Sequence, residues 1–549
     1  MKRILEITLL LLVINNAESQ PVVNFRLNLE DLINVGLFSP ENGDKVYVRG
    51  SFNDWNGVSH QLKYTPSYNL YQGSFNISAL PGDTVAYKYV IQKDHDRVFW
   101  EYNPDPSNPD HGNRRLVITG DELVLPEARF HYDEYFGFPV LFSKDKLQDD
   151  FLQFRAILEE THPALYDYTE KSVMDSLFDG NYVRIDTALD FRTFFILMTE
   201  VISKVGCGHS SLWVPGTYWN VAPRKLFPIK LYISDDEVYA TGTYGDDQGI
   251  PIGSEILTIN GIPVTTLYNR LESQTSADGF NLSYRRAQVS KNFSVKYALA
   301  FGFPDIFKVV YISPGAQNHI ETTLTPVSKE TVDQGTTALS KFSFEEEEGS
   351  NTAVLTINTF AYYNQVDMFK DFIDSVFHVI NRESIGNLVL DLRGNSGGDP
   401  FCASYLWAYL QPEPLPYFEE HYGKYDTLAN PVPLPSKHFM GNLYTLIDGN
   451  GFSTTGHFCG LLKYHRVGKF VGTELGSTYT CTGNATYPAL NHTGIMVGTA
   501  RVRRYSAAVK NMDPRRGIIP DYVMELTQQD IITGNDAILE FALSLSGDF

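Results

Sequence analysis

Three apolar runs that alternate with helical patterns constrain the fold of this 549-residue chain more than any other feature. The runs occupy 353–360, 387–392 and 443–448, and the helical patterns occupy 366–381, the residues after Pro400 and the residues from the Ser453 turn through Leu461. Short, continuous apolar runs predict buried strands. Because strand, helix and strand follow one another, the sequence predicts a parallel α/β unit.

Two glycine-rich turns follow these strands and carry the chemistry. Arg393-Gly-Asn-Ser-Gly-Gly398 ends the second strand, and a pair of glycines leaves backbone N–H groups free to face a ligand, as in an oxyanion hole. Ser453 follows the third strand at the start of a helix, where developing negative charge is favoured. A serine hydroxyl is a poor nucleophile alone and needs a base within hydrogen-bonding reach.

A helical region precedes this unit. Apolar residues recur at three- and four-residue steps from Ser143 until Thr161-His162-Pro163 ends the pattern. A second pattern, 191–202, runs into Gly206-Cys-Gly-His209. We therefore expect His209 just past a helix end, on a glycine-flanked turn.

The segment 249–264 has the Gly-x-x-x-Gly, apolar strand and Asn-Gly turn that PDZ domains show. Asn260-Gly261 predicts a tight hairpin, because its residues readily adopt positive φ. In a PDZ fold an exposed strand edge binds an extended peptide. The alternative is a structural hairpin within the surrounding domain.

The stretch Asp391–Gly398 together with Gly451–Thr455 resembles the paired signature of tail-specific serine proteases, and the helical and PDZ-like regions precede it in the family's order. The resemblance implies an α/β core of the crotonase/ClpP-like type. It implies Ser453 as the nucleophile. The amide of Thr454 and that of Gly397 or Gly398 would form the oxyanion hole.

The resemblance also indicates which residue acts as the base, because two branches of the family use different residues. The main branch uses a lysine, but the corresponding stretch 471–480 contains none. The chain is similar instead to the histidine-using, tricorn-like branch, which implies His209 as the base. His457 stands one turn after Ser453, where relatives often carry Glu, and it is the alternative base.

Two carboxylates are candidates for the acid that orients the imidazole. Glu474 lies in the stretch where a lysine is absent. Asp513 lies just before Gly517-Ile-Ile-Pro-Asp521, which resembles the family's closing Gly-Val-x-Pro-Asp. The sequence does not choose between them.

The first part of the chain has short alternating segments separated by turns between Val46 and Ile118, which predicts an antiparallel β-sandwich. It resembles starch- and glycogen-binding modules at Gly50–Asn56, Leu80–Gly82, Tyr87–Tyr89, Phe99–Glu101 and Asn113–Arg115. The resemblance implies a glucan site lined by Trp55, Lys88, Trp100 and Asn113. The insertion 104–111 departs from the family's compact loop.

The N-terminal residues indicate the location of the protein, and the net charge limits the partners that it can bind. Lys2 and Arg3, the apolar run 7–14 and the small residues Ala17 and Ser19 predict a signal peptide and a mature chain from Gln20, secreted or in the cell envelope (periplasmic). An N-terminal membrane anchor is disfavoured because the run is too short. The formal net charge of −21 disfavours nucleic acid.

Neither a cofactor nor a metal is expected, because no CxxC or HExxH pattern occurs. Four cysteines in an exported chain allow three disulfide connectivities. Cys402 and Cys459 lie in helical, partly apolar settings and are expected to be buried thiols.

The expected fold is multidomain, and the expected function is that of a serine endopeptidase acting on exported, unfolded or C-terminal peptide segments. The divisions are 1–19 signal peptide, 20–125 starch-binding-like sandwich, 126–142 linker, 143–224 helical region, 225–275 PDZ-like segment and 276–549 catalytic core. The alternative function is non-catalytic binding of peptide or lipid on a protease-like fold. A glycosidase is disfavoured, because no pair of carboxylates points to a shared site.

Overall fold

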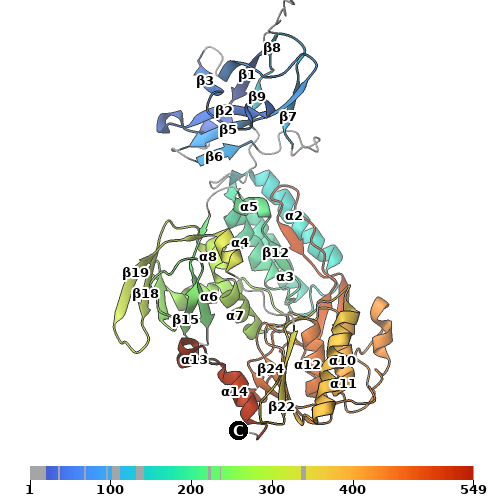
Figure 1. Cartoon of the computed structure of the whole chain (residues 1–549). Helices are drawn as coiled ribbons and strands as arrows, with labels where there is room; N and C mark the ends of the chain where they lie inside the picture. The colour runs from blue at the N-terminus through green and yellow to red at the C-terminus, as the bar shows by residue number, and fades with distance from the viewer. Residues whose placement is uncertain are drawn as a thin grey trace, which may run out of the picture. The chain divides into compact units, whose positions relative to one another are not determined.

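The computed structural model describes residues 20–34, 38–66, 70–93, 97–101, 112–130, 141–220, 224–234, 237–335 and 342–547. The expected signal peptide and the insertion 104–111 lie outside the described residues. The chain forms two compact units, residues 1–140 and 141–549, and the fold is multidomain and mixed α/β (Figure 1). No helix among the described residues is long and apolar enough to span a lipid bilayer.

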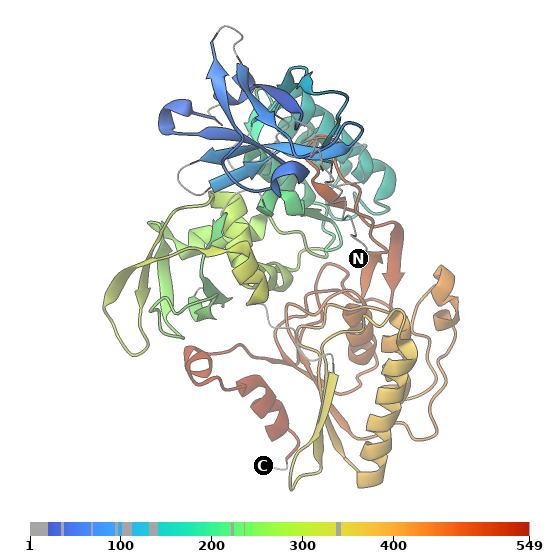
Figure 2. The same ribbon diagram turned by 45° about the horizontal axis from the view of Figure 1, so that its top comes forward.

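The first unit is built largely from strands (Figure 2), and these surround an apolar core. Its described elements are β1 (Val22–Asn28), α1 (Glu30–Asn34), β2 (Lys45–Gly50), β3 (Gln61–Thr65), β4 (Leu70–Asn76), β5 (Thr84–Lys93), β6 (Arg97–Trp100), β7 (Arg114–Val117), β8 (Glu122–Val124) and β9 (Ala128–Arg129). The strand order is β6-β5-β2-β3-β4-β1-β8, with β7 beside β5 and β9 beside β1. Burial alternates along β1, as expected of a strand with one face on a core.

Both helices predicted at the start of the second unit are confirmed, at 144–161 and 191–202, and a third helix at 171–183, which was not predicted, lies between them. The elements are β10 (Leu141–Phe142), α2 (Lys144–Thr161), α3 (Lys171–Val183), β11 (Leu189–Asp190), α4 (Phe191–Ile202), β12 (Ser211–Trp213) and α5 (Gly216–Asn220). Buried Asp150 of α2 accepts hydrogen bonds from the backbone of His492 and Thr493. β12 pairs with β27 (Met496–Gly498). These contacts hold the helical region against the C-terminal part of the chain.

A second sheet follows, with strand order β14-β15-β16-β18-β19 and β17 beside β16. The elements are β13 (Lys225–Leu226), β14 (Ile229–Ile233), β15 (Val238–Thr243), β16 (Glu255–Ile259), β17 (Ile262–Pro263), α6 (Val264–Ser273), α7 (Leu282–Lys291), α8 (Phe293–Phe301), β18 (Phe307–Ile312), β19 (His319–Leu324), β20 (Val327–Ser328) and α9 (Lys329–Gln334). The hairpin predicted at Asn260-Gly261 is confirmed: φ is 51° and 76° there, between paired strands β16 and β17.

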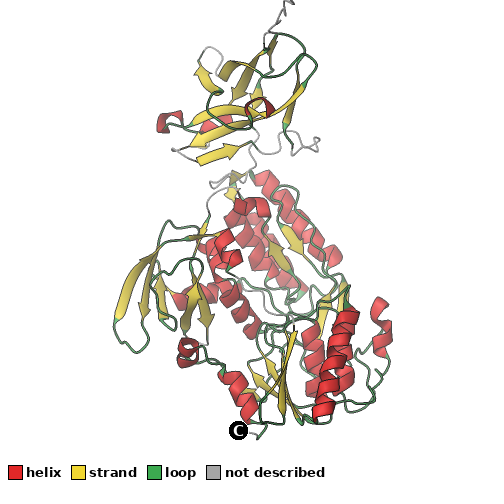
Figure 3. Ribbon diagram, viewed as in Figure 1, coloured by secondary structure: helices red, strands yellow, loops and turns green. Residues whose placement is uncertain are grey.

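The predicted α/β unit is confirmed as a sheet of order β21-β22-β23-β24-β25-β29, parallel except for β21 (Figure 3). The elements are β21 (Phe342–Glu346), β22 (Thr352–Ile357), α10 (Val366–Glu383), β23 (Asn387–Asp391), α11 (Pro400–Leu410), β24 (Asn442–Ile447), α12 (Thr454–Tyr464), β25 (Lys469–Gly472), β26 (Thr480–Gly483), β28 (Val502–Ser506), β29 (Tyr522–Val523), α13 (Gln528–Thr533) and α14 (Ala537–Ser544).

Helices cover both faces of this sheet, which explains the continuous apolar runs. Along β22, Leu355 packs in one core with residues of α10, α11 and α12. Its neighbour Val354 packs on the opposite face with Ile538 of α14. Because β23 and β24 are parallel, the turns that follow them lie at the same edge of the sheet, the carboxyl edge. Gly397, Gly398 and Ser453 are in these turns.

Candidate active site

Ser453 occupies the turn between β24 and α12. Its φ of 57° and ψ of −119° lie where residues with a side chain are rarely found, and such strain persists when the surroundings enforce it. Partly buried Asp448 stabilises the turn by accepting hydrogen bonds from the amides of Gly394 and Gly451. Ser453 is thus fixed at the N-terminus of α12, where the helix dipole favours negative charge.

The double glycine lies against Ser453 and cannot carry side chains. φ is 92° at Gly397 and 146° at Gly398, both in the region that favours glycine. A Cβ on Gly397 would lie 2.9 Å from the Cβ of Ser453 and 2.9 Å from the amide nitrogen of Thr454. A Cβ on Gly398 would lie 2.1 Å from the amide nitrogen of Ala361.

The amides beside Ser453 differ in what they bind. The N–H of Gly397 donates to the side-chain oxygen of buried Asn395, at 2.9 Å. The N–H of Thr454 is in the first turn of α12 and has no acceptor within that helix. Among the residues that the structure describes, the N–H of Gly398 has no acceptor either. The two uncommitted donors beside Ser453 are therefore those of Gly398 and Thr454.

The fold brings His209 to Ser453 across 244 residues of sequence: its Nε2 lies 3.2 Å from the serine Oγ. The imidazole packs against the ring of Phe452, with 4.7 Å between centroids. A Cβ on Gly208 would lie 2.5 Å from the Phe452 ring, so the glycine next to His209 permits this approach. The expected position of His209 on a turn past α4 is confirmed.

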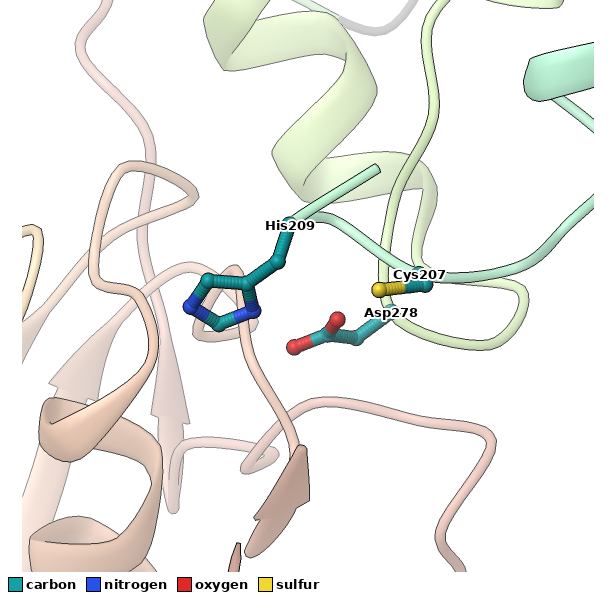
Figure 4. Close-up of side chains that lie close together, drawn as sticks. All are labelled: Cys207, His209 and Asp278. Carbon is teal, nitrogen blue, oxygen red and sulfur yellow. The ribbon is translucent and has the colours of Figure 1, made fainter. Parts of the chain in front are cut away.

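A carboxylate that the sequence did not indicate, Asp278, faces the other side of the imidazole. Figure 4 shows its oxygens directed toward the ring nitrogen of His209 that is turned away from Ser453. That atom, Nδ1, is buried and has no hydrogen-bond partner among the described residues. Asp278 is itself buried and accepts hydrogen bonds from the amide of Gly208 at 2.8 Å and the hydroxyl of Ser477 at 2.7 Å.

Both acids expected from the sequence bind arginines instead. Glu474 pairs with Arg516, at 2.6 Å, and also accepts the amide of Gly517. Asp513 pairs with Arg515, at 3.0 Å. The carboxylate facing His209 is neither of them. Asp278 lies in the connection between α6 and α7, and no motif in the sequence distinguishes it.

Burial keeps both His209 and His457 neutral by lowering their pKa values. It lowers the pKa of His209, although the Asp278 carboxylate partly offsets the effect, so the ring is neutral and can accept a proton at neutral pH. Burial lowers the pKa of His457 to about 3. The Nε2–H of His457 donates to the carbonyl of Tyr505, at 2.9 Å, which commits that nitrogen to the backbone.

Among the residues expected to bind sugar, Trp55 and Trp100 lie together in the first unit, with ring centroids 6.1 Å apart. The guanidinium of Arg49 lies over Trp100, at 5.4 Å. Lys88 is opposite Arg49 in the paired strands β2 and β5, so the two share a face. Asn113 is buried just before β7.

The chain was compared with known protein families, curated proteins and solved structures. Residues 351–524 match the model of Peptidase family S41. No curated protein matches the chain in sequence.

Among solved structures, mature CPAF complexed with lactacystin aligns with a TM-score of 0.52 and 11% identity, over 73% of this chain and 98% of that one. A CPAF mutant aligns with a TM-score of 0.56 and 12% identity, over 73% and 96%. The photosystem II D1 C-terminal processing protease aligns with a TM-score of 0.36 and 16% identity, over 71% and 98%. The two CPAF structures show that the fold is shared.

Proposed function

We propose that this chain, a serine-type peptidase whose S41 domain spans residues 351–524, hydrolyses unfolded or C-terminal segments of exported proteins by acyl transfer through Ser453. The observation that carries the proposal is the 3.2 Å separation of the His209 Nε2 and the Ser453 Oγ. These are the two atoms between which a proton moves when a serine hydroxyl attacks a carbonyl.

The reaction would proceed in two halves. The Oγ of Ser453 attacks the peptide carbonyl carbon while Nε2 of His209 takes the hydroxyl proton, and the same nitrogen then protonates the departing amine. A water molecule next attacks the acyl-enzyme, and His209 again accepts and returns a proton. Asp278 acts through His209: its carboxylate orients Nδ1–H and stabilises the imidazolium. In the free enzyme His209 Nδ1 has no hydrogen-bond partner among the described residues, and we expect it to form a hydrogen bond with the Asp278 carboxylate when substrate binds.

The oxyanion hole is assigned to the N–H groups of Gly398 and Thr454. Each lies beside Ser453 and is uncommitted among the described residues, whereas the N–H of Gly397 is used by Asn395. Gly397 then serves to permit close contact, and Asn395 keeps the loop in place by also accepting the hydroxyl of Thr455, at 2.9 Å.

The PDZ-like sheet would deliver the substrate. β14 is one of the two edge strands of that sheet, and a strand edge can pair with an extended peptide. A cavity of about 1080 Å³ is lined by Tyr232 of β14, by Arg286 of α7 and by Asn450, which is in the same turn as Ser453. An extended chain bound at β14 would thus lie beside a cavity that borders the turn in which Ser453 lies.

A fluorophosphonate probe tests the mechanism, because it reacts only with an activated serine. The wild-type protein should be labelled, and Ser453→Ala should not. A folded wild type that resists labelling would favour the alternative of a non-catalytic peptide- or lipid-binding protein.

A second function is favoured by one observation in the first unit, the Trp55 and Trp100 pair. We propose that these rings stack on glucose units of a glucan, with Lys88 and Asn113 donating to hydroxyl groups. Retardation of the protein in gels that contain soluble starch tests this site.

A further inference from the structure

A third side chain, Cys207, accompanies His209 and Asp278, although serine-type hydrolysis has no need of it. Cys207 and His209 lie on one turn after α4, and Asp278 comes from the connection between α6 and α7 (Figure 4). One donor atom from each residue, the thiol sulfur, an imidazole nitrogen and a carboxylate oxygen, lies within 4.8 Å of the other two. The thiol and the carboxylate belong to buried residues.

This donor set suits a zinc ion. Zn²⁺ binds Cys sulfur at about 2.3 Å and His nitrogen or Asp oxygen at about 2.0 Å, so neighbouring ligands of a tetrahedral site are roughly 3.3–3.6 Å apart. Because the three atoms are at most 4.8 Å apart, zinc binding requires them to approach by at most about 1.5 Å. No CxxC or HExxH pattern announces such a site, because its third ligand comes from a separate loop.

Each ligand has capacity for the ion. His209 Nδ1 is buried and has no hydrogen-bond partner among the described residues. Each oxygen of Asp278 accepts one hydrogen bond, from Gly208 or from Ser477, and keeps a second lone pair. These bonds are the kind of outer support that orients metal ligands. The Cys207 thiol is not in a disulfide, and its sulfur lies 2.8 Å from the Thr482 hydroxyl.

A cavity of about 10 Å³, about the space that one water molecule needs, lies beside two of the three residues, Cys207 and Asp278. A catalytic zinc commonly has three protein ligands and one water. We expect a water from this cavity to be the fourth ligand.

We propose that Cys207, His209 and Asp278 bind one zinc ion and that its binding reversibly inhibits hydrolysis. The ion takes the Nδ1 atom and the carboxylate on which the base depends, and the Cys207 thiol proton passes to solvent when the sulfur binds. The inhibition rests on the proposed roles of His209 and Asp278. The binding of zinc does not.

Binding is tested on the full-length Ser453→Ala protein after removal of metal by a chelator. Addition of Co²⁺ should give the visible bands of a tetrahedral site and a near-ultraviolet thiolate-to-cobalt band, and dialysis against Zn²⁺ should leave one tightly held equivalent. Cys207→Ser should lose the thiolate band. Cys402→Ser and His492→Ala are the controls, since Cys402 is a buried thiol elsewhere and His492 belongs to a separate, more exposed cluster with Asp149 and Asp150.

Inhibition is tested on the active protein. Cys207→Ser should keep its metal-free rate and require at least about tenfold more Zn²⁺ for half-inhibition, and a chelator should restore the wild-type rate. Absence of the thiolate band from the Ser453→Ala protein overturns the proposal without reliance on any ligand variant. Equal zinc sensitivity of wild type and Cys207→Ser overturns it as well. Failure of the proposed hydrolysis appears separately, as a wild type that binds cobalt through the thiol but does not react with the fluorophosphonate even after a chelator has removed all metal.

Discussion

Substitution of Asp278 by Asn tests the assignment that sequence reasoning missed. The change keeps the size of the side chain and removes its charge. A carboxylate oxygen and an imidazole nitrogen within 4.8 Å of each other interact by about 3.5 kcal/mol or more at an effective dielectric constant of about 20. Because the imidazolium forms only during the reaction, this loss falls on the transition state. We expect kcat/KM to fall by roughly 300-fold or more.

The pH profile separates this effect from structural damage. His209 must be neutral to accept the proton, so activity rises with pH through the pKa of His209. Burial lowers that pKa and Asp278 raises it. Removing the carboxylate therefore lowers the pKa further, and the acid limb of kcat/KM should move to lower pH. Simple damage to the fold would reduce the rate without this movement.

The assay is steady-state cleavage of an unfolded protein substrate between about pH 4 and 9, a range that brackets the ordinary pKa of histidine. Glu474→Gln and Asp513→Asn are matched controls, because each removes one carboxylate that pairs with an arginine instead. Both should retain the wild-type acid limb. If Glu474→Gln or Asp513→Asn moved the limb while Asp278→Asn did not, the assignment of Asp278 would be refuted.

Three further predictions concern Ser453, the loop beside it and the first unit. Ser453→Ala and His209→Ala should each reduce kcat by about 10⁴–10⁶, and the double variant should be little worse, because the two act as a unit; additive losses in kcat would contradict this. Gly398→Ala should abolish fluorophosphonate labelling and lower the melting temperature, whereas Gly349→Ala, which has open space around it, should keep labelling. Trp100→Ala should remove retardation in starch gels, and a wild type that is not retarded would leave the first unit without a glucan site.

Local patterns predicted much of the catalytic unit. Leu388, Val389 and Leu390 form a continuous apolar run because both faces of β23 are covered, and that burial is visible in sequence. The turn at Ser453 was also predictable, since a strand, glycines and a helix fix its geometry within a few residues. Each of these features depends on neighbours along the chain.

The features that were missed depend on packing between distant segments. Asp278 reaches His209 only because the connection between α6 and α7 folds against the turn after α4. The choice between Gly397 and Gly398 likewise depends on the Asn395 side chain, which occupies one of the two amides. A pair of glycines in the sequence indicates that backbone N–H groups can face a ligand. It does not show which of these N–H groups is already hydrogen-bonded to a side chain.

The stretch 471–480, where the sequence lacks a lysine, has a role in this structure that can itself be tested. Burial raises the pKa of the Asp278 carboxyl group, and Ser477, whose hydroxyl donates to it at 2.7 Å, offsets part of that rise. A hydrogen bond to a charged group contributes about 1.5–3 kcal/mol, so Ser477→Ala should reduce kcat/KM by roughly 10- to 150-fold if the whole loss reaches the transition state. Ser477→Thr keeps the hydroxyl and should restore activity. If Ser477→Thr were as impaired as Ser477→Ala, packing rather than the hydrogen bond to Asp278 would account for the loss.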